Sequence, residues 1–252
     1  MNILTYIIVF VTSFFAGFMG GQVGGGGLIL LPMLLLVGLN PLVALGTSRF
    51  SGIFLNVVGT WQHLRHHKIP TNHVLLFGIM SLLGSLGGSL LVFYLPIDME
   101  NLKKIIIAVL FLILVIVFFS QKLGQIDNDL HPSKKHYVLL SIMVFLIGIY
   151  GGVIGVAMTT FFMMLFTFYK QSYLQSMAYA ILLSLIASII ATIIFMYYGS
   201  VDYTLGILQG IGGGIGTYFG SRFIIKKGNL WLKYILAVVI LITLGKMGWD
   251  LF

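Results

Sequence analysis

The sequence contains no cysteine, which excludes disulfides, thiolate metal ligands and cysteine nucleophiles. Charged residues are also scarce, at 8% of 252 residues against 59% hydrophobic residues, and the mean hydropathy is +1.09. Such a composition excludes an ordinary soluble domain and predicts an all-α polytopic membrane protein. We interpret the apolar start, residues 2–18, as the first membrane segment rather than as a signal peptide.

Acidic residues are the rarest charged group, and all six lie in predicted loops or at segment ends: Asp98, Glu100, Asp127, Asp129, Asp202 and Asp250. No carboxylate is therefore predicted near the bilayer midplane, where proton pumps and divalent-cation transporters place them. The net charge of +8 comes from basic residues at segment ends, which indicates membrane topology rather than a nucleic-acid surface.

Long hydrophobic runs make up most of the chain. There are eight of them: residues 4–39, 42–64, 73–95, 102–119, 137–168, 173–198, 203–225 and 231–249. Six are close to the roughly 20 residues that cross a hydrocarbon core. Runs 4–39 and 137–168 are too long for one crossing, since as straight helices they would reach about 50 Å. We therefore predict a break or a hairpin in each of them.

The chain repeats itself internally. GSLGGSL at 84–90 matches GTYFGSR at 216–222, an offset of 132 residues, and AGFMGGQVG at 16–24 aligns with IGIYGGVIG at 147–155. We predict two homologous membrane repeats, residues 1–121 and 137–252, joined by a polar cytoplasmic linker at 122–136.

The distribution of Lys and Arg predicts how the repeats are related. If the long runs are hairpins, each repeat has about five membrane segments, and the two sides of the membrane carry ten and four basic residues. If the long runs are single spans, the division is eight and six. The stronger asymmetry favours two inverted repeats with both termini outside. The hairpin arms are short, so full spans and re-entrant arms both stay open.

Residues 17–32, GFMGGQVGGGGLILLP, contain seven glycines and no charge. Each glycine disfavours a continuous helix by roughly 1 kcal/mol relative to alanine, which predicts an unwound backbone here. The free N–H groups and positive dipole ends of broken helices suit an anion, to which Gln22 could donate a further hydrogen bond. The alternative is that these glycines serve only close helix packing.

Arg49, in ALGTSRFSG, is the one basic residue deep in an apolar context. It has no carboxylate in sequence reach, so an anion is its natural partner. The alternative is an arginine that extends to the outer interface. In the second repeat, residues 151–160 exchange several glycines for larger residues but add two threonines. The candidate substrate-binding residues are Gln22, Gly24, Gly25, Gly26, Gly27, Thr47, Ser48, Arg49, Thr159, Thr160 and Tyr179.

The histidine-rich segment 61–69, WQHLRHHKI, is the densest polar cluster. His63 and His67 have the i, i+4 spacing of metal ligands on one helical face. Because no acid is nearby, we favour interfacial anchoring and anion attraction, and we predict no metal site. The small-residue patterns at Gly84/Gly88 and Gly212/Gly216/Gly220 predict close helix packing.

These motifs together resemble the sulfite exporter TauE/SafE family, also called TSUP. The resemblance covers the whole chain and is carried by residues 20–48, by RHHKI from Arg65, and by the closing motifs at 84 and 216. It implies a permease of the cytoplasmic membrane for a small sulfur-containing or organic anion such as sulfite, thiosulfate, sulfoacetate or another sulfonate.

We therefore expect secondary transport by alternating access, coupled to H⁺ or Na⁺, by a monomer or homodimer that is no enzyme and has no cofactor. The alternatives are an anion channel and a histidine-cluster metal-binding membrane protein.

Overall fold

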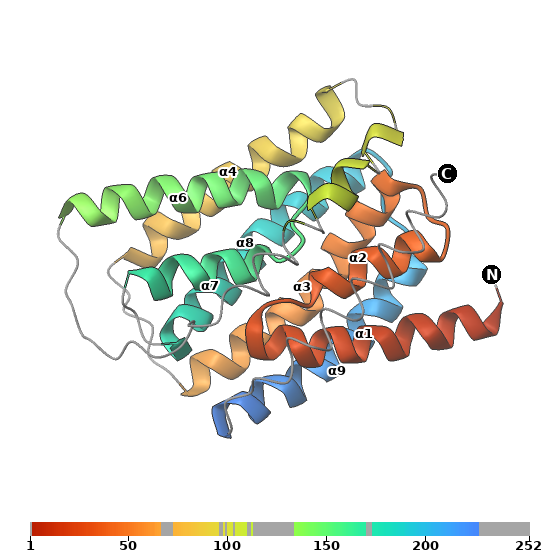
Figure 1. Ribbon diagram of the computed structural model, residues 1–252, viewed down its shortest axis with the longest axis horizontal. Coiled ribbons are helices and arrows are strands. Elements are labelled where there is room, and N and C mark those ends of the chain that lie inside the picture. The colour runs from red at the N-terminus through yellow and green to blue at the C-terminus, as the bar shows by residue number, and fades with distance from the viewer. Residues whose placement is uncertain are drawn as a thin grey trace.

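The computed structural model describes residues 2–66, 73–95, 98, 100–102, 104–109, 112, 134–169 and 173–226. The labelled helices of these regions are α1 (Ile3–Val23), α2 (Gly27–Leu36), α3 (Pro41–His66), α4 (Val74–Tyr94), α6 (Lys134–Val153), α7 (Met158–Phe168), α8 (Tyr173–Tyr197) and α9 (Tyr203–Lys226) (Figure 1). The predicted run 231–249, most of run 102–119 and linker residues 122–133 lie outside the described residues. The last three residues of the predicted linker already belong to α6.

Both over-long runs are broken, as predicted. In the first run α1 ends at Val23, and Gly24 follows with φ 78°. In the second run α6 ends at Val153, and Gly155 adopts φ 64°. Glycine enters this left-handed region without steric cost and commonly ends helices there. The two glycines occupy matching positions of the aligned segments 16–24 and 147–155, so both repeats break at the same point.

Each break is followed by a short helix, α2 with 10 residues and α7 with 11. At 1.5 Å per residue these helices reach only about 15 Å, half of a hydrocarbon core. Each long run is therefore a hairpin with one long arm and one short arm. This geometry fits re-entrant arms better than full spans.

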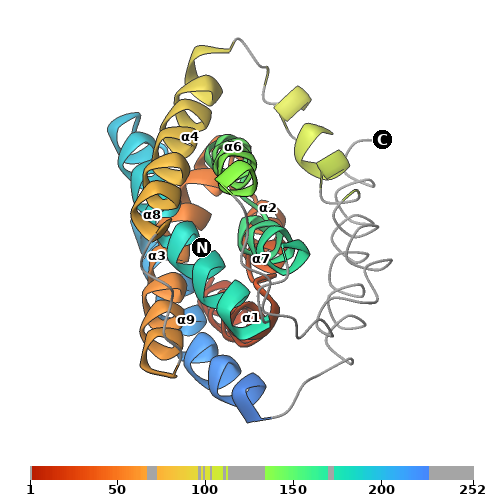
Figure 2. The same ribbon diagram turned by 90° about the vertical axis from the view of Figure 1, so that its left-hand side faces the viewer.

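The helices form two layers (Figure 2). One layer is a wall in the order α4, α8, α3, α9, and the other contains the two hairpins α1–α2 and α6–α7. At the two edges of the wall α9 packs on α1, and α4 packs on α6. The hairpins approach each other from opposite ends, so that their turns meet in the middle of the molecule (Figure 1).

Equivalent helices of the two halves run in opposite directions. Helix α9 is parallel to α1 and to α3, because the residue numbers of contacting positions increase together along both helices. Helix α4 is parallel to α6 and to α8 for the same reason. In contrast, α3 and α8 are antiparallel, and Asn56 of α3 donates to Ser188 of α8, 132 residues away, at 3.4 Å. This hydrogen bond joins positions that are separated by the repeat offset, which is the contact that inverted repeats would produce. Inverted repeats stay a prediction, and this arrangement supports it.

Glycines allow the edge pairs to pack backbone against backbone. A Cβ on Gly84 or Gly88 of α4 would overlap carbonyl oxygens of α6, and one on Gly216 or Gly220 of α9 would overlap carbonyl oxygens of α1. The predicted packing role of these glycines is confirmed. Serine hydroxyls add equivalent bonds at both interfaces: Ser89 donates to the Gly152 carbonyl at 3.5 Å, and Ser221 donates to the Gly21 carbonyl at 3.3 Å.

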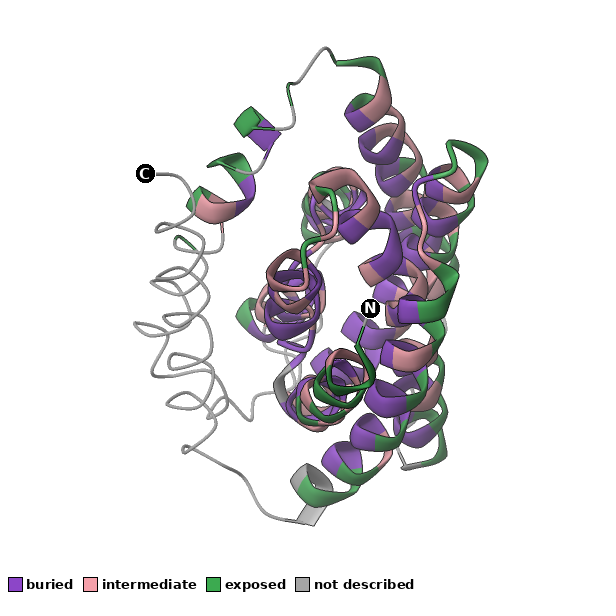
Figure 3. Cartoon of the chain, turned by 90° about the vertical axis from the view of Figure 1, so that its right-hand side faces the viewer, coloured by how far each residue is buried: buried purple, intermediate pink, exposed green. Residues whose placement is uncertain are grey.

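Five helices of the described regions are long and apolar enough to cross a membrane: residues 3–22, 41–65, 74–94, 136–153 and 173–197. The predicted segment 203–225 is helical in α9 but is not among them, because its many glycines and polar residues lower its hydropathy. Exposed residues lie on the outside of the bundle (Figure 3). Many are large and apolar, such as Ile3, Leu4 and Leu75, so lipid is their natural solvent.

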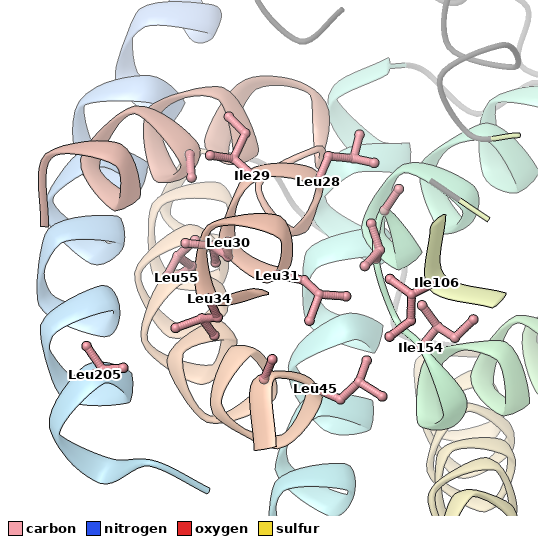
Figure 4. Packing of buried hydrophobic residues seen from close by; sticks show 14 of the residues in the cluster. Leu28, Ile29, Leu30, Leu31, Leu34, Leu45, Leu55, Ile106, Ile154 and Leu205 are labelled. Carbon is pink, nitrogen blue, oxygen red and sulfur yellow. The ribbon is translucent and has the colours of Figure 1, made fainter. Parts of the chain in front are cut away.

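The short helix α2 lies in the core of the protein. Leu28, Leu31 and Leu34 are fully buried, and α2 side chains extend in several directions toward residues such as Leu45, Leu55 and Ile154 (Figure 4). A helix that is apolar all round is expected to be enclosed by protein or lipid. Here protein encloses it, so the turn before α2 is held firmly at the centre of the molecule.

Candidate functional site

The turns of the two hairpins contact each other. A Cβ added to Gly24 would lie 2.9 Å from the Thr160 nitrogen, and one added to Gly27 would lie 3.6 Å from the Ala157 nitrogen. The turns therefore meet backbone to backbone, and side chains at Gly24 would separate them. The starts of α2 and α7 are brought together. At the start of α2 the N–H groups of Leu28, Ile29 and Leu30 donate to the carbonyls of the preceding turn, and at the start of α7 the Met158 N–H donates to the Gly155 carbonyl.

A cavity of about 70 Å³ lies at this meeting point, between the hairpin turns and helices α3 and α8. Its lining residues are Gly20, Gly24, Gly26, Gly27, Leu30, Ser48, Arg49, Gly52, Leu55, Asn56, Ile154, Gly155, Val156, Ala157, Met158, Thr159, Ile181, Ser188 and Thr217. Both halves of the chain contribute, including the hydrogen-bonded pair Asn56 and Ser188. The cavity therefore lies where the two predicted repeats meet.

Arg49 supplies the one formal charge in this lining. It is only 4% exposed, and neither its Nε nor its Nη2 has a hydrogen-bond partner among the described residues. The ion pair found in the described regions, Lys104 with Glu100, lies elsewhere. An unpaired buried cation costs several kcal/mol, which makes this guanidinium a candidate for binding an anion. The alternative, an Arg49 side chain that extends to the interface, does not fit this burial.

Gly155 makes room for Arg49. A Cβ at this position would overlap Nη1, Cζ and Nη2 of the guanidinium, so the flat group lies directly against the Cα of the second hairpin turn. The Tyr150 hydroxyl donates to the Val156 carbonyl at 2.7 Å and holds this turn in place. The arginine of the first repeat is thus positioned by the broken helix of the second.

The neutral polar lining is partly engaged within the protein. Ser48 donates to the Leu45 carbonyl at 2.8 Å, Thr159 donates to Ser184 Oγ at 2.9 Å, and Thr217 donates to the Gly17 carbonyl at 3.2 Å. Among the described residues, the Asn56 amide makes only the long bond to Ser188. Arg49 and Asn56 are therefore the side-chain donors best placed to bind an anion in the cavity.

Six of the predicted residues line the cavity: Gly24, Gly26, Gly27, Ser48, Arg49 and Thr159. The other five, Gln22, Gly25, Thr47, Thr160 and Tyr179, are not in the lining. Thr47 accepts a hydrogen bond from the Asp202 N–H at 2.8 Å and so braces the start of α9. Tyr179 stacks on Phe166, with ring centroids 4.7 Å apart, within a separate hydrophobic cluster.

Gln22 and Thr160 lie close to the hairpin turns but are buried outside the cavity. The Gln22 side-chain amide donates to the Phe18 carbonyl at 3.2 Å, and the Gln22 backbone carbonyl accepts a hydrogen bond from the Tyr173 hydroxyl. This arrangement ties α1 to the start of α8. The buried Gln22 Oε1 has no partner in the described part of the chain.

The sequence reasoning missed Gly52, Asn56, Ile181, Ser188 and Thr217. One signal was available for two of them, because Asn56 and Ser188 are polar residues separated by the repeat offset. Ile181 is the counterpart of Arg49 at the same offset, and it faces the cavity too. The cavity is thus symmetric in its backbone and asymmetric in its charge.

The histidine cluster is only partly described. His63 is fully buried within α3, rather than placed at an interface as expected, while His67 lies outside the described residues. In the described regions no three His, Asp or Glu side chains come together in a group that could hold a metal ion.

Broken helices that meet at a polar cavity inside a multi-pass bundle are typical of a membrane transporter. The family model of the Sulfite exporter TauE/SafE matches residues 9–247. The chain belongs to this family and is a transporter of the cell membrane. No solved structure matches it significantly.

Relatives over the whole length carry transporter names. The chain is 33% identical over 232 residues to the "Probable membrane transporter protein ORF9" of Sinorhizobium sp, covering 92% of this chain and 87% of the relative. It is 26% identical over 244 residues to YfcA of Escherichia coli K12, covering 96% and 89%. It is also 26% identical over 245 residues to YdhB of Bacillus subtilis, covering 95% and 96%. Both are named probable membrane transporter proteins.

Proposed function

We propose that the protein is a permease for a small sulfur-containing or organic anion, with sulfite as the best-fitting member of the class. Transport would proceed by alternating access about the cavity between two inverted repeats. The observation that carries this proposal is Arg49, whose guanidinium is buried in the cavity with Nε and Nη2 unpartnered in the described regions.

The size and chemistry of the cavity support a compact oxyanion. Its volume of about 70 Å³ has room for a few water molecules, and so for one anion of similar size. Sulfoacetate and thiosulfate would need the hairpin turns to separate further. The described lining contains no acid, so a proton or Na⁺ that accompanies the anion would bind through the anion itself or through backbone carbonyls.

The binding test is a thermal-shift screen of the purified protein against sulfite, thiosulfate, sulfoacetate, taurine and acetate. A ligand that binds only the folded state at 100 times its Kd stabilises it by about 2.7 kcal/mol. We expect sulfite to raise the Tm of the wild type and to leave that of Arg49→Met unchanged. Equal shifts in both proteins would refute the role of Arg49.

The ligand-free proteins provide a second readout. Because Arg49 is a buried cation without a partner, its replacement by an apolar residue of similar length should stabilise the empty protein. We expect Arg49→Met to have a higher Tm than the wild type in the absence of anion. A lower Tm would indicate a structural role for Arg49 and would contradict the proposal.

A further inference from the structure

At one end of the bundle, two arginines and two aromatic rings form a continuous stack across α3 and α9. The Arg65 guanidinium lies over the Trp61 ring, 4.3 Å from its centroid. The Trp61 ring stacks on Tyr218 of α9, with centroids 6.3 Å apart and planes 20° apart. The Arg222 guanidinium lies over the Tyr218 ring at 4.5 Å. The order of the stack is therefore cation, ring, ring, cation.

The stack is accessible from outside the protein. Arg65 and Arg222 are exposed, Trp61 is 44% exposed and Tyr218 is half-buried. Neither arginine forms an ion pair within the described residues. Since α3 and α9 are parallel, both arginines lie near the ends of their helices and at the same end of the bundle.

Acidic residues of the described regions lie at the other end. Asp202 precedes α9, whereas Asp98 and Glu100 follow α4, which runs antiparallel to α9. Among the described residues, the Arg65 end therefore carries basic side chains and no acidic one. In the topology predicted from the Lys and Arg count, it faces the cytoplasm.

This geometry points to a binding site for the phosphate of an anionic phospholipid. A guanidinium that lies over an aromatic ring can keep N–H groups free, and its planar set of donors matches the oxygens of a phosphate. Trp and Tyr rings belong at headgroup depth, and basic residues beside the membrane attract the anionic lipids of the cytoplasmic leaflet. Each arginine would bind a headgroup phosphate from its own end of the stack while the rings between them contact the glycerol region. This site is separate from the transport cavity.

The test uses the purified full-length protein in detergent micelles that contain either phosphatidylglycerol or phosphatidylcholine. We expect phosphatidylglycerol to raise the Tm more than phosphatidylcholine does. The doubly substituted Arg65→Gln/Arg222→Gln protein should lose this difference, with an apparent affinity for phosphatidylglycerol reduced roughly tenfold or more. Lys104→Gln, which removes an exposed charge at the opposite end, should keep it.

Three results would overturn the proposal. The first is an unchanged preference for phosphatidylglycerol in the double variant. The second is a loss of that preference in Lys104→Gln as large as the loss in the double variant. The third is an Arg65- and Arg222-dependent shift of the same size with inorganic phosphate, which would assign the site to a free anion rather than a lipid. Native mass spectrometry of the wild type adds a test without variants: phosphatidylglycerol should stay bound at collision energies that remove phosphatidylcholine.

Discussion

Gly155→Ala should disable the proposed anion site although it leaves Arg49, the residue that would bind the anion, unsubstituted. The added Cβ would overlap three atoms of the Arg49 guanidinium. Ordinary non-bonded contact begins near 3.4 Å, so the guanidinium would have to retreat by about 2 Å. Hydrogen bonds tolerate only about 0.5 Å of variation in length, so the bonds from Arg49 to an anion would be lost.

The size of the effect follows from the bonds removed. Hydrogen bonds to a charged group contribute about 1.5–3 kcal/mol, which corresponds to roughly a 10- to 150-fold increase in Kd for the anion. Alanine at a left-handed φ costs a further 1–2 kcal/mol, approximately, in folding stability. We expect both effects in Gly155→Ala, measured by isothermal titration calorimetry with sulfite and by thermal unfolding.

Gly199→Ala is the matched control. Gly199 has φ 65°, nearly the same as the 64° of Gly155, but a Cβ there would meet no atom within 4 Å. We expect Gly199→Ala to show the loss of stability and to bind sulfite like the wild type. In an Arg49→Ala background, Gly155→Ala should have no further effect on binding, because it acts through Arg49. Wild-type sulfite affinity in the Gly155→Ala single variant would refute the reasoning.

Three further predictions test the predicted repeats, the hydrogen bond between Thr47 and the start of α9, and the glycine packing between α4 and α6. Arg49→Ile should abolish sulfite binding in calorimetry. Adding Ile181→Arg moves the charge to the equivalent position of the other predicted repeat and should restore part of the binding. No recovery in the double variant would argue against a cavity shared by both repeats. Thr47→Val should lower the stability by about 1 kcal/mol, because it leaves a backbone N–H unpaired, and should leave sulfite affinity unchanged. Gly84→Ala should destabilise the protein by about 1–3 kcal/mol through overlap with α6, whereas Gly87→Ala, whose Cβ meets nothing within 4 Å, should be neutral or stabilising; equal Tm values would contradict the close packing.

The sequence predicted the breaks in the long runs because their cause is local. Length sets a limit on a single span, and clustered glycines show where a helix can end, so both turns follow from composition. The packing role of Gly84 and Gly88 could be predicted for the same reason. The bounds of α2 and α7, and with them the short arms, depend on tertiary contacts that no local pattern reports.

The sequence predicted the part of the candidate site in which a single residue is unusual for its surroundings. An arginine in an apolar segment without an acid is costly in any fold, so Arg49 stands out from the sequence alone. Thr47 and Tyr179 were chosen for their proximity to that arginine or to its repeat counterpart, but neighbours on a helix face different directions. Thr47 faces the start of α9, and Tyr179 faces a cluster of aromatic rings. Gly155 could not be assigned its role, because its function is to leave space for a side chain 106 positions away.

The central claim is that the buried Arg49 guanidinium binds the transported anion, and uptake by proteoliposomes tests it most directly. The measurement is the uptake of radiolabelled sulfite by vesicles that contain the wild type, Arg49→Gln or the control Lys104→Gln, which removes an exposed basic residue outside the cavity. We predict saturable uptake, accelerated by unlabelled sulfite inside the vesicles, for the wild type and for Lys104→Gln, and uptake at the level of empty vesicles for Arg49→Gln. Wild-type uptake by Arg49→Gln would contradict the account, and non-saturable flux without this acceleration would indicate a channel.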